Sequence, residues 1–284
     1  MLQRINRFYT ILHFILMLFV CLIVLLTRYV PSQSGLLHSL STEGGFFEWG
    51  SFLISFTTSG LALLVYFQSR GKKIFRKARR RFILLIAIGT YVIAMEEISW
   101  GQRILGFKSD DFFSIYNMQK ETNLHNLVSG EYLNLVIYSL IYIFFIYLPL
   151  AVYFYPKLGS NSPSISGKIS IYLPSIHNML MFCFASGLQA YFLPRTLADT
   201  TFLWLAMLLV IFLLLSKKKY RNRFLIFHLA LVLFTCIIFA TCYEVFDYYN
   251  MQYEIREFVI AYAFLYWFFN WTTNLKNKIA LQLK

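Results

Sequence analysis

Residues 95–126, MEEISWGQRILGFKSDDFFSIYNMQKETNLHN, bring together carboxylates, amides, an arginine and a histidine directly after a long apolar run. Carboxyl groups near a membrane interface can serve as general acids or bases, and residues four apart share one face of a helix. We therefore predict Glu96, Glu97, Glu121 and His125 as catalytic residues. If a divalent metal ion takes part, its predicted ligands are Glu97, Glu121 and His125. The sequence indicates no other cofactor.

Other side chains in and beyond this segment suit the recognition of a polar or anionic head group, because amides and arginines bind sugar and phosphate oxygens. The i, i+3 spacing of Glu254 and Glu257 also places two carboxylates on one face of a later helix. The predicted substrate-binding residues are Trp100, Gln102, Arg103, Asn117, Gln119, Asn123, Asn126, Arg195, Glu244 and Glu254.

The composition favours a membrane protein as the scaffold for these residues. Apolar residues make up 58% of the 284-residue chain and charged residues only 14%, which is typical of polytopic membrane proteins. The net charge of +13 comes from short basic clusters between apolar runs, a pattern typical of loops that face anionic lipid. Membrane lipids are therefore the expected partners, and nucleic acid is not.

Apolar runs long enough, or nearly so, to cross a bilayer predict an all-α bundle of about eight transmembrane helices in a single domain, 1–284. Closed barrels are excluded because the runs do not alternate with period two. The predicted spans are approximately 8–30, 47–68, 82–99, 132–155, 171–193, 198–216, 224–243 and 255–273.

The basic residues predict which side of the membrane each loop faces. With eight spans, 20 of the 26 Lys and Arg residues fall on the side that holds both termini, so both termini are predicted to be cytoplasmic. All 13 Asp and Glu residues then fall on the outer side. Charge asymmetry alone would also produce this distribution, without any functional site.

Residues 101–131 are predicted to form an amphipathic lid at the outer face. Ser109 and Asp110 suit a helix N-cap. A helix from Asp110 to about Val128 would align Asn117, Glu121 and His125 on one polar stripe. Phe82 to Met95 spans only about 21 Å as a helix, so the two glutamates that follow are expected slightly below the outer interface.

Two further patterns bear on the layout. The segments RRRF at 79–82 and RNRF at 221–224 each precede an apolar run that ends in glutamate. A parallel duplication of four plus four helices would explain this weak echo.

Three histidines, His13, His177 and His228, lie in the cytoplasmic halves of their predicted helices. They are suspects for function only if they converge.

Comparison with intramembrane CAAX-type proteases begins from Glu96-Glu97, because that family carries a Glu-Glu-x-x-x-Arg motif. Here the position that requires arginine holds Gly101, and the arginine comes at Arg103. The motif is therefore not satisfied, and the family's function is not carried over.

We expect an enzyme that acts on a lipid or lipid-linked substrate from the extracytoplasmic side, as a hydrolase or transferase, with Glu/His acid–base chemistry that a metal could assist. The alternatives are an ion- or proton-coupled transporter or channel, or a membrane assembly or sensing subunit with a protein partner or a second copy of the chain. The absence of large loops fits the inner membrane of a bacterium.

Overall fold

The computed structural model describes residues 2–30, 35–41, 44–71, 77–117, 119–127, 136–137, 139–155, 172–188, 197–217, 223–242, 244 and 252–282. Every regular element in these ranges is a helix, so the predicted all-α class is confirmed for the described residues. The main helices are α1 (Leu2–Tyr29), α3 (Phe46–Gln68), α4 (Lys77–Glu97), α10 (Ile176–Gly187), α11 (Leu197–Ser216), α12 (Arg223–Thr241) and α14 (Gln252–Gln282).

Shorter elements connect these helices or extend them. Two of them, η4 and α8, follow one another directly and lie within the apolar run expected at 132–155. The shorter elements are α2 (Leu36–Ser41), η2 (Ser99–Gly101), α5 (Gln102–Leu105), α6 (Asp111–Tyr116), η3 (His125–Leu127), the π-helix η4 (Tyr142–Tyr147) and α8 (Leu148–Phe154).

Each expected apolar run contains a helix, but fewer helices than expected can cross a membrane by length and composition. Among the described residues three stretches qualify: Ile11–Tyr29, His38–Gln68 and Arg223–Thr241. A fourth is added if Lys77–Glu97 and Ser99–Leu105, which meet at 64°, form one broken span. The expected number of about eight is therefore only partly met. One reason is length, since α10 has 12 residues and a span needs about 20.

Helix α10 lies at the centre of the larger hydrophobic core. Ile176 and every residue from Asn178 to Gly187 are buried, and α10 packs against α11, α12, α14 and η4. Ser175 caps its N-terminus by accepting a hydrogen bond from the Asn178 backbone N–H at 3.3 Å. The Asn178 amide donates to the Ala263 carbonyl of α14 at 2.9 Å, which joins the two helices near the start of α10.

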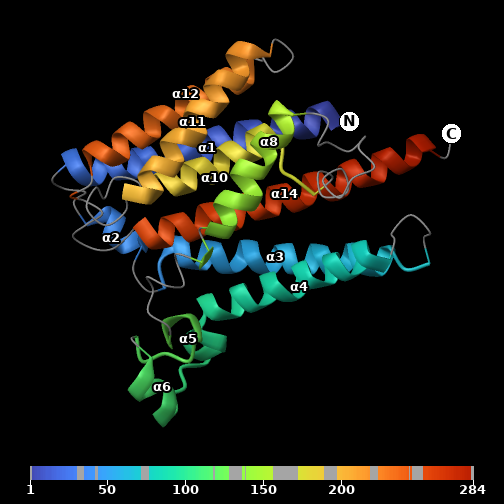
Figure 1. Cartoon of the computed structure of the whole chain (residues 1–284). Coiled ribbons are helices and arrows are strands. Elements are labelled where there is room, and N and C mark those ends of the chain that lie inside the picture. The colour runs from blue at the N-terminus through green and yellow to red at the C-terminus, as the bar shows by residue number, and fades with distance from the viewer. Residues whose placement is uncertain are drawn as a thin grey trace.

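Helices α3 and α4 form an antiparallel pair that packs on α14 (Figure 1). Small residues line the contact, so the backbones approach closely. The Ser59 hydroxyl of α3 donates to the Ala87 carbonyl of α4 at 2.8 Å. On the α14 side, a Cβ on Gly50 would overlap the Phe258 ring. Only glycine therefore fits at position 50 without repacking.

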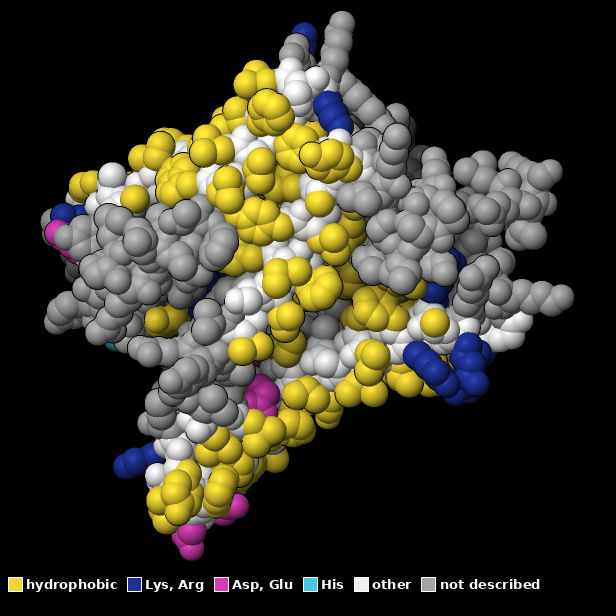
Figure 2. All heavy atoms as spheres, viewed as in Figure 1, with side chains coloured by type: hydrophobic (Ala, Val, Ile, Leu, Met, Phe, Trp, Pro, Cys, Tyr) yellow, Lys and Arg dark blue, Asp and Glu magenta, His cyan; other side chains and the backbone are white. Residues whose placement is uncertain are grey.

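The helices place the polar segment at one end of the molecule. The N-terminal end of α1 and the C-terminal end of α14 lie toward one end, with the turn between α3 and α4, whereas α5 and α6 project at the other (Figure 1). Hydrophobic side chains cover much of the face in Figure 2. Exposed examples on α4 are Leu85, Ile88, Tyr91, Val92 and Ile93. Such faces need lipid or another apolar surface to cover them.

Candidate functional site

The chain changes direction sharply after Glu97. Ser99, Trp100 and Gly101 have φ values of 48°, 55° and 91°, so three successive residues lie in the left-handed region. This conformation strains the two non-glycine residues. The Ser99 hydroxyl donates to Glu121 at 2.5 Å, and the Trp100 indole donates to Glu96. These bonds hold the bend of 64° between α4 and the first segment of the lid.

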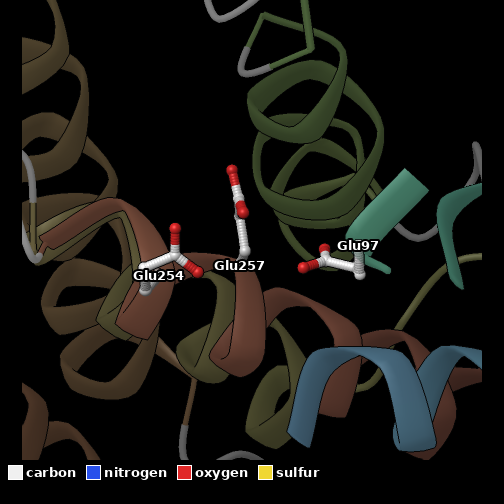
Figure 3. A group of neighbouring side chains, drawn as sticks. All are labelled: Glu97, Glu254 and Glu257. Atoms are coloured by element: carbon white, nitrogen blue, oxygen red, sulfur yellow. The ribbon is translucent and has the colours of Figure 1, made fainter. Parts of the chain in front are cut away.

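Three carboxylates meet beside this bend. Glu97 at the end of α4 and Glu254 and Glu257 in the first two turns of α14 place one oxygen each within 4.8 Å of one another. Figure 3 shows Glu97 pointing from α4 toward the two α14 glutamates. All three are partly exposed. Ionised carboxylates this close repel one another, so a shared proton or a nearby cation stabilises such a group.

Arg103 ties the lid to the helical body. Its Nη2 donates to both carboxylate oxygens of Glu121, at 3.0 and 2.8 Å, and its Nη1 forms an ion pair with Glu48 of α3. The side chain of Arg103 is 17% exposed, that of Glu121 15% and that of Glu48 9%. A guanidinium between two largely buried carboxylates fixes their positions, because each acid depends on the shared cation. Glu121, a predicted catalytic residue, is therefore engaged in this network.

Asn117 ends the lid helix earlier than expected. Its side-chain oxygen accepts hydrogen bonds from the backbone N–H groups of Gln119 and Glu121, at 2.9 and 3.3 Å, and its amide donates to Asn123. Local side-chain bonds of this kind compete with the helix. The predicted helix from Asp110 to Val128 is therefore wrong: α6 stops at Tyr116, although the Asp110 cap is present, with its carboxylate accepting from Phe113 N–H at 3.0 Å.

A second set of bonds closes the lid on itself. Gln102 accepts from the Thr122 backbone N–H at 2.7 Å and donates to the Ser109 hydroxyl at 3.0 Å. Asn123 donates to Ser99 and Glu121 at 3.3 and 3.2 Å, and Asn126 donates to Gln119. These hydrogen bonds hold the fold of the lid.

Glu96 and Glu97 have different surroundings although they are adjacent. Glu96 accepts hydrogen bonds from Trp100 and, at 2.7 Å, from the Leu124 backbone N–H, so it belongs to the lid network. Glu97 faces α14 instead (Figure 3). Among the predicted catalytic residues, Glu97 is the one that the structure places with acids from another helix.

The remaining predicted residues are placed as follows. The side chain of His125 and the whole of Arg195 lie outside the described residues, so the predicted Glu121–His125 pairing rests on the sequence alone. Glu244 forms an ion pair with Arg28 at 2.9 Å, with both side chains well exposed. Glu254 joins the three-carboxylate cluster.

Two glutamates of this region were not among the predicted site residues. Glu48 is largely buried and pairs with Arg103, yet nothing in its sequence neighbourhood singles it out. Glu257 had one signal, its i, i+3 spacing from Glu254. The partner on α4 is far away in the sequence, so this signal could not identify the cluster.

The three histidines His13, His177 and His228 lie close together. His177 and His228 place their Nδ1 atoms 3.1 Å apart, and the rings of His13 and His228 have centroids separated by 5.5 Å. His13, His177 and His228 come from α1, α10 and α12, respectively. The condition that made them suspects for function is therefore met by their geometry.

Comparison with known proteins identifies no matching family model, no matching curated protein and no matching solved structure. The functional argument for this chain therefore rests on its own residues.

Proposed function

We propose that this chain is a membrane-embedded enzyme that acts on a lipid or lipid-linked substrate from the extracytoplasmic side. In this proposal the described helices belong to a bundle of about eight spans in a bacterial inner membrane, with both termini cytoplasmic. The three or four stretches able to cross a membrane support the membrane setting. The position of the α1 and α14 ends opposite the lid supports the shared side of the termini.

The observation that carries the proposal is the meeting of Glu97 with Glu254 and Glu257. The fold holds carboxylates from two helices within 4.8 Å of one another, although ionised carboxylates at this distance repel. Such acids near a membrane are therefore suspects for proton or cation binding. Oxygen ligands of this kind suit Mg²⁺, Mn²⁺ or Ca²⁺.

The chemistry assigned to the cluster follows from these ligands. Glu97, Glu254 and Glu257 would hold a divalent cation, which would supply Lewis-acid activation of a phosphoryl or carbonyl oxygen. The oxygen of a ligand carboxylate that does not bind the cation would accept the proton of an attacking water or hydroxyl group. Glu97 is the best candidate for this base, because it ends the helix from which the lid departs.

The lid suits an amphiphilic substrate. It combines the polar network around Arg103 with exposed apolar side chains beside it. The exposed apolar residues of the lid and its approach are Ile104, Leu105, Phe107, Phe112, Ile115, Tyr116 and Leu124. An apolar surface next to polar groups can lie in the membrane interface, where lipid head groups meet their chains.

The test uses the purified full chain in lipid nanodiscs. Mn²⁺ binding, followed by loss of the free-ion electron paramagnetic resonance signal, should be at least about tenfold weaker in Glu97→Gln and Glu257→Gln than in the wild type. That loss matches the size expected when a metal site is disturbed. Asp111→Asn is the matched control, because Asp111 is an exposed carboxylate in the first turn of α6 and lies outside the cluster.

Activity is tested by incubating the same samples with a bacterial lipid extract and identifying products by mass spectrometry. A product made by the wild type and by Asp111→Asn, but absent in Glu97→Gln, supports the enzyme. Equal product formation in Glu97→Gln, or wild-type protein that neither binds Mn²⁺ nor converts any lipid, would refute it.

The close approach of His13, His177 and His228 favours ion- or proton-coupled transport as the second candidate function. In that reading the glutamate cluster is an outer cation-binding vestibule. Proteoliposomes then show cation or proton flux that Glu97→Gln abolishes, and no lipid is converted.

A further inference from the structure

Three histidines from three helices are packed together in the interior, away from the lid residues discussed above. His13 and His228 are fully buried, and His177 is partly exposed. The rings of His177 and His228 stack, with centroids 5.4 Å apart and 18° between their planes. The His13 ring lies edge-on to Tyr266, with centroids 4.5 Å apart.

Buried ring nitrogens at this position lack hydrogen-bond partners. Among the residues that the structure describes, both nitrogens of His13 and Nε2 of His228 have none. A buried polar atom without a partner is destabilising, and a neutral imidazole always carries both a donor and an acceptor. Ordinary packing histidines are satisfied by backbone or side-chain groups. The surroundings of His13, which include the Tyr262 and Tyr266 rings, do not provide this.

The spacing of the nitrogens fits a shared metal ion. Two imidazole nitrogens bound to one tetrahedral ion at about 2.0–2.1 Å lie about 3.3 Å apart. The His177 and His228 Nδ1 atoms are 3.1 Å apart. The His13 ring lies beside this pair, with its centroid 5.5 Å from that of His228, and would have to rotate and move toward it to become a third ligand.

We propose that His13, His177 and His228 bind a divalent transition metal ion such as Zn²⁺. Imidazole nitrogens select ions of this class over Mg²⁺ and Ca²⁺, which prefer oxygen. The histidine site shares no residue with the glutamate cluster. The inference goes beyond the proposed function and does not depend on it.

Zn²⁺ is the first probe, and the protein is the full chain in nanodiscs after removal of metal with a chelator. The wild type should retain about one Zn²⁺ per chain after dialysis, as a single site per chain requires, measured by inductively coupled plasma mass spectrometry. The loss of affinity in His228→Gln and His177→Gln should be at least the roughly 10- to 100-fold caused by changing a group that supports a metal ligand. His38→Gln is the matched control, because His38 is exposed on α2.

Co²⁺ provides a second measurement that reports the ligands directly. A tetrahedral site with histidine nitrogens gives visible d–d absorption, which should appear in the wild type and in Glu97→Gln but not in His228→Gln. If His228→Gln fails to fold, the comparison is made between His13→Gln and His38→Gln. The Zn²⁺-dependent rise in melting temperature is then the readout.

Two outcomes would overturn the proposal. One is a wild-type chain that retains no Zn²⁺, in which case His177 and His228 simply share an N–H···N hydrogen bond. The other is Zn²⁺ binding of equal affinity in His228→Gln, His13→Gln and His38→Gln, which would place the ion elsewhere.

Discussion

Arg103 and Glu121 form a two-oxygen ion pair, with Nη2 at 3.0 and 2.8 Å from the carboxylate, and the same guanidinium also pairs with Glu48 of α3. This single side chain therefore connects the lid to a helix of the body. The connection keeps Arg103 and Glu121 of the lid against α3, close to the end of α4.

Replacing Arg103 should release the lid. Arg103→Gln leaves Glu48 and Glu121 largely buried without their shared cation, and such a loss costs about 3 kcal/mol or more. Hydrogen exchange should therefore become faster at the Thr122 and Leu124 amides, which donate to Gln102 and Glu96. The amides of α10 provide an internal reference that should not change.

Arg103→Lys is the matched control for charge. Lysine keeps the positive charge but cannot bind both oxygens of Glu121 and reach Glu48 with a planar fork. It should give protection between that of the wild type and that of Arg103→Gln. Unchanged exchange in Arg103→Gln would mean that the lid is held by its amide network alone.

Gly50→Ala should weaken the packing of α3 on α14. The added Cβ would overlap the Phe258 ring, and such overpacking costs about 1–3 kcal/mol. Thermal unfolding in detergent, followed by circular dichroism, should show a lower melting temperature. Gly60→Ala, in the same helix, is the control, because its Cβ would have nothing within 4 Å. Equal melting temperatures for the two variants would contradict the described α3–α14 contact.

The proposed sidedness can be measured with single cysteines. The four native cysteines are all buried, so an exposed cysteine introduced at position 77 or 108 should dominate labelling by a membrane-impermeant maleimide. In intact bacterial spheroplasts Lys108→Cys should react, because the lid is placed outside. Lys77→Cys should react only after permeabilisation. Labelling of Lys77→Cys in intact spheroplasts would reverse the proposed orientation.

Local patterns in the sequence were sufficient for the helices and for some ends. Apolar runs located α1, α3, α4, α11, α12 and α14, because a backbone in an apolar medium must satisfy its own hydrogen bonds. The cap of α6 is Asp110, which lies within the segment predicted to hold it. The number of spans was harder to predict, because a run of apolar residues does not distinguish a full span from a short buried helix such as α10.

The lid shows where a local pattern misled. Polar residues at i, i+4 and i+8 suggested one helical stripe through Asn117, Glu121 and His125. The Asn117 side chain instead binds two backbone N–H groups and ends the helix. Helix spacing and side-chain turns compete at such a residue, and the outcome depends on contacts that only the folded lid provides.

The sequence by itself determined that this chain is helical and rich in membrane-compatible segments, and that its polar residues gather after Glu96. Tertiary structure alone decided which polar residues of the whole chain come into contact. Glu97 lies beside Glu254 and Glu257, Arg103 pairs with Glu48, and His13 joins His177 and His228. These residues are far apart along the chain, so no local periodicity encodes their contact. The packing of α3 and α14, and of α10 between its neighbours, brings them together.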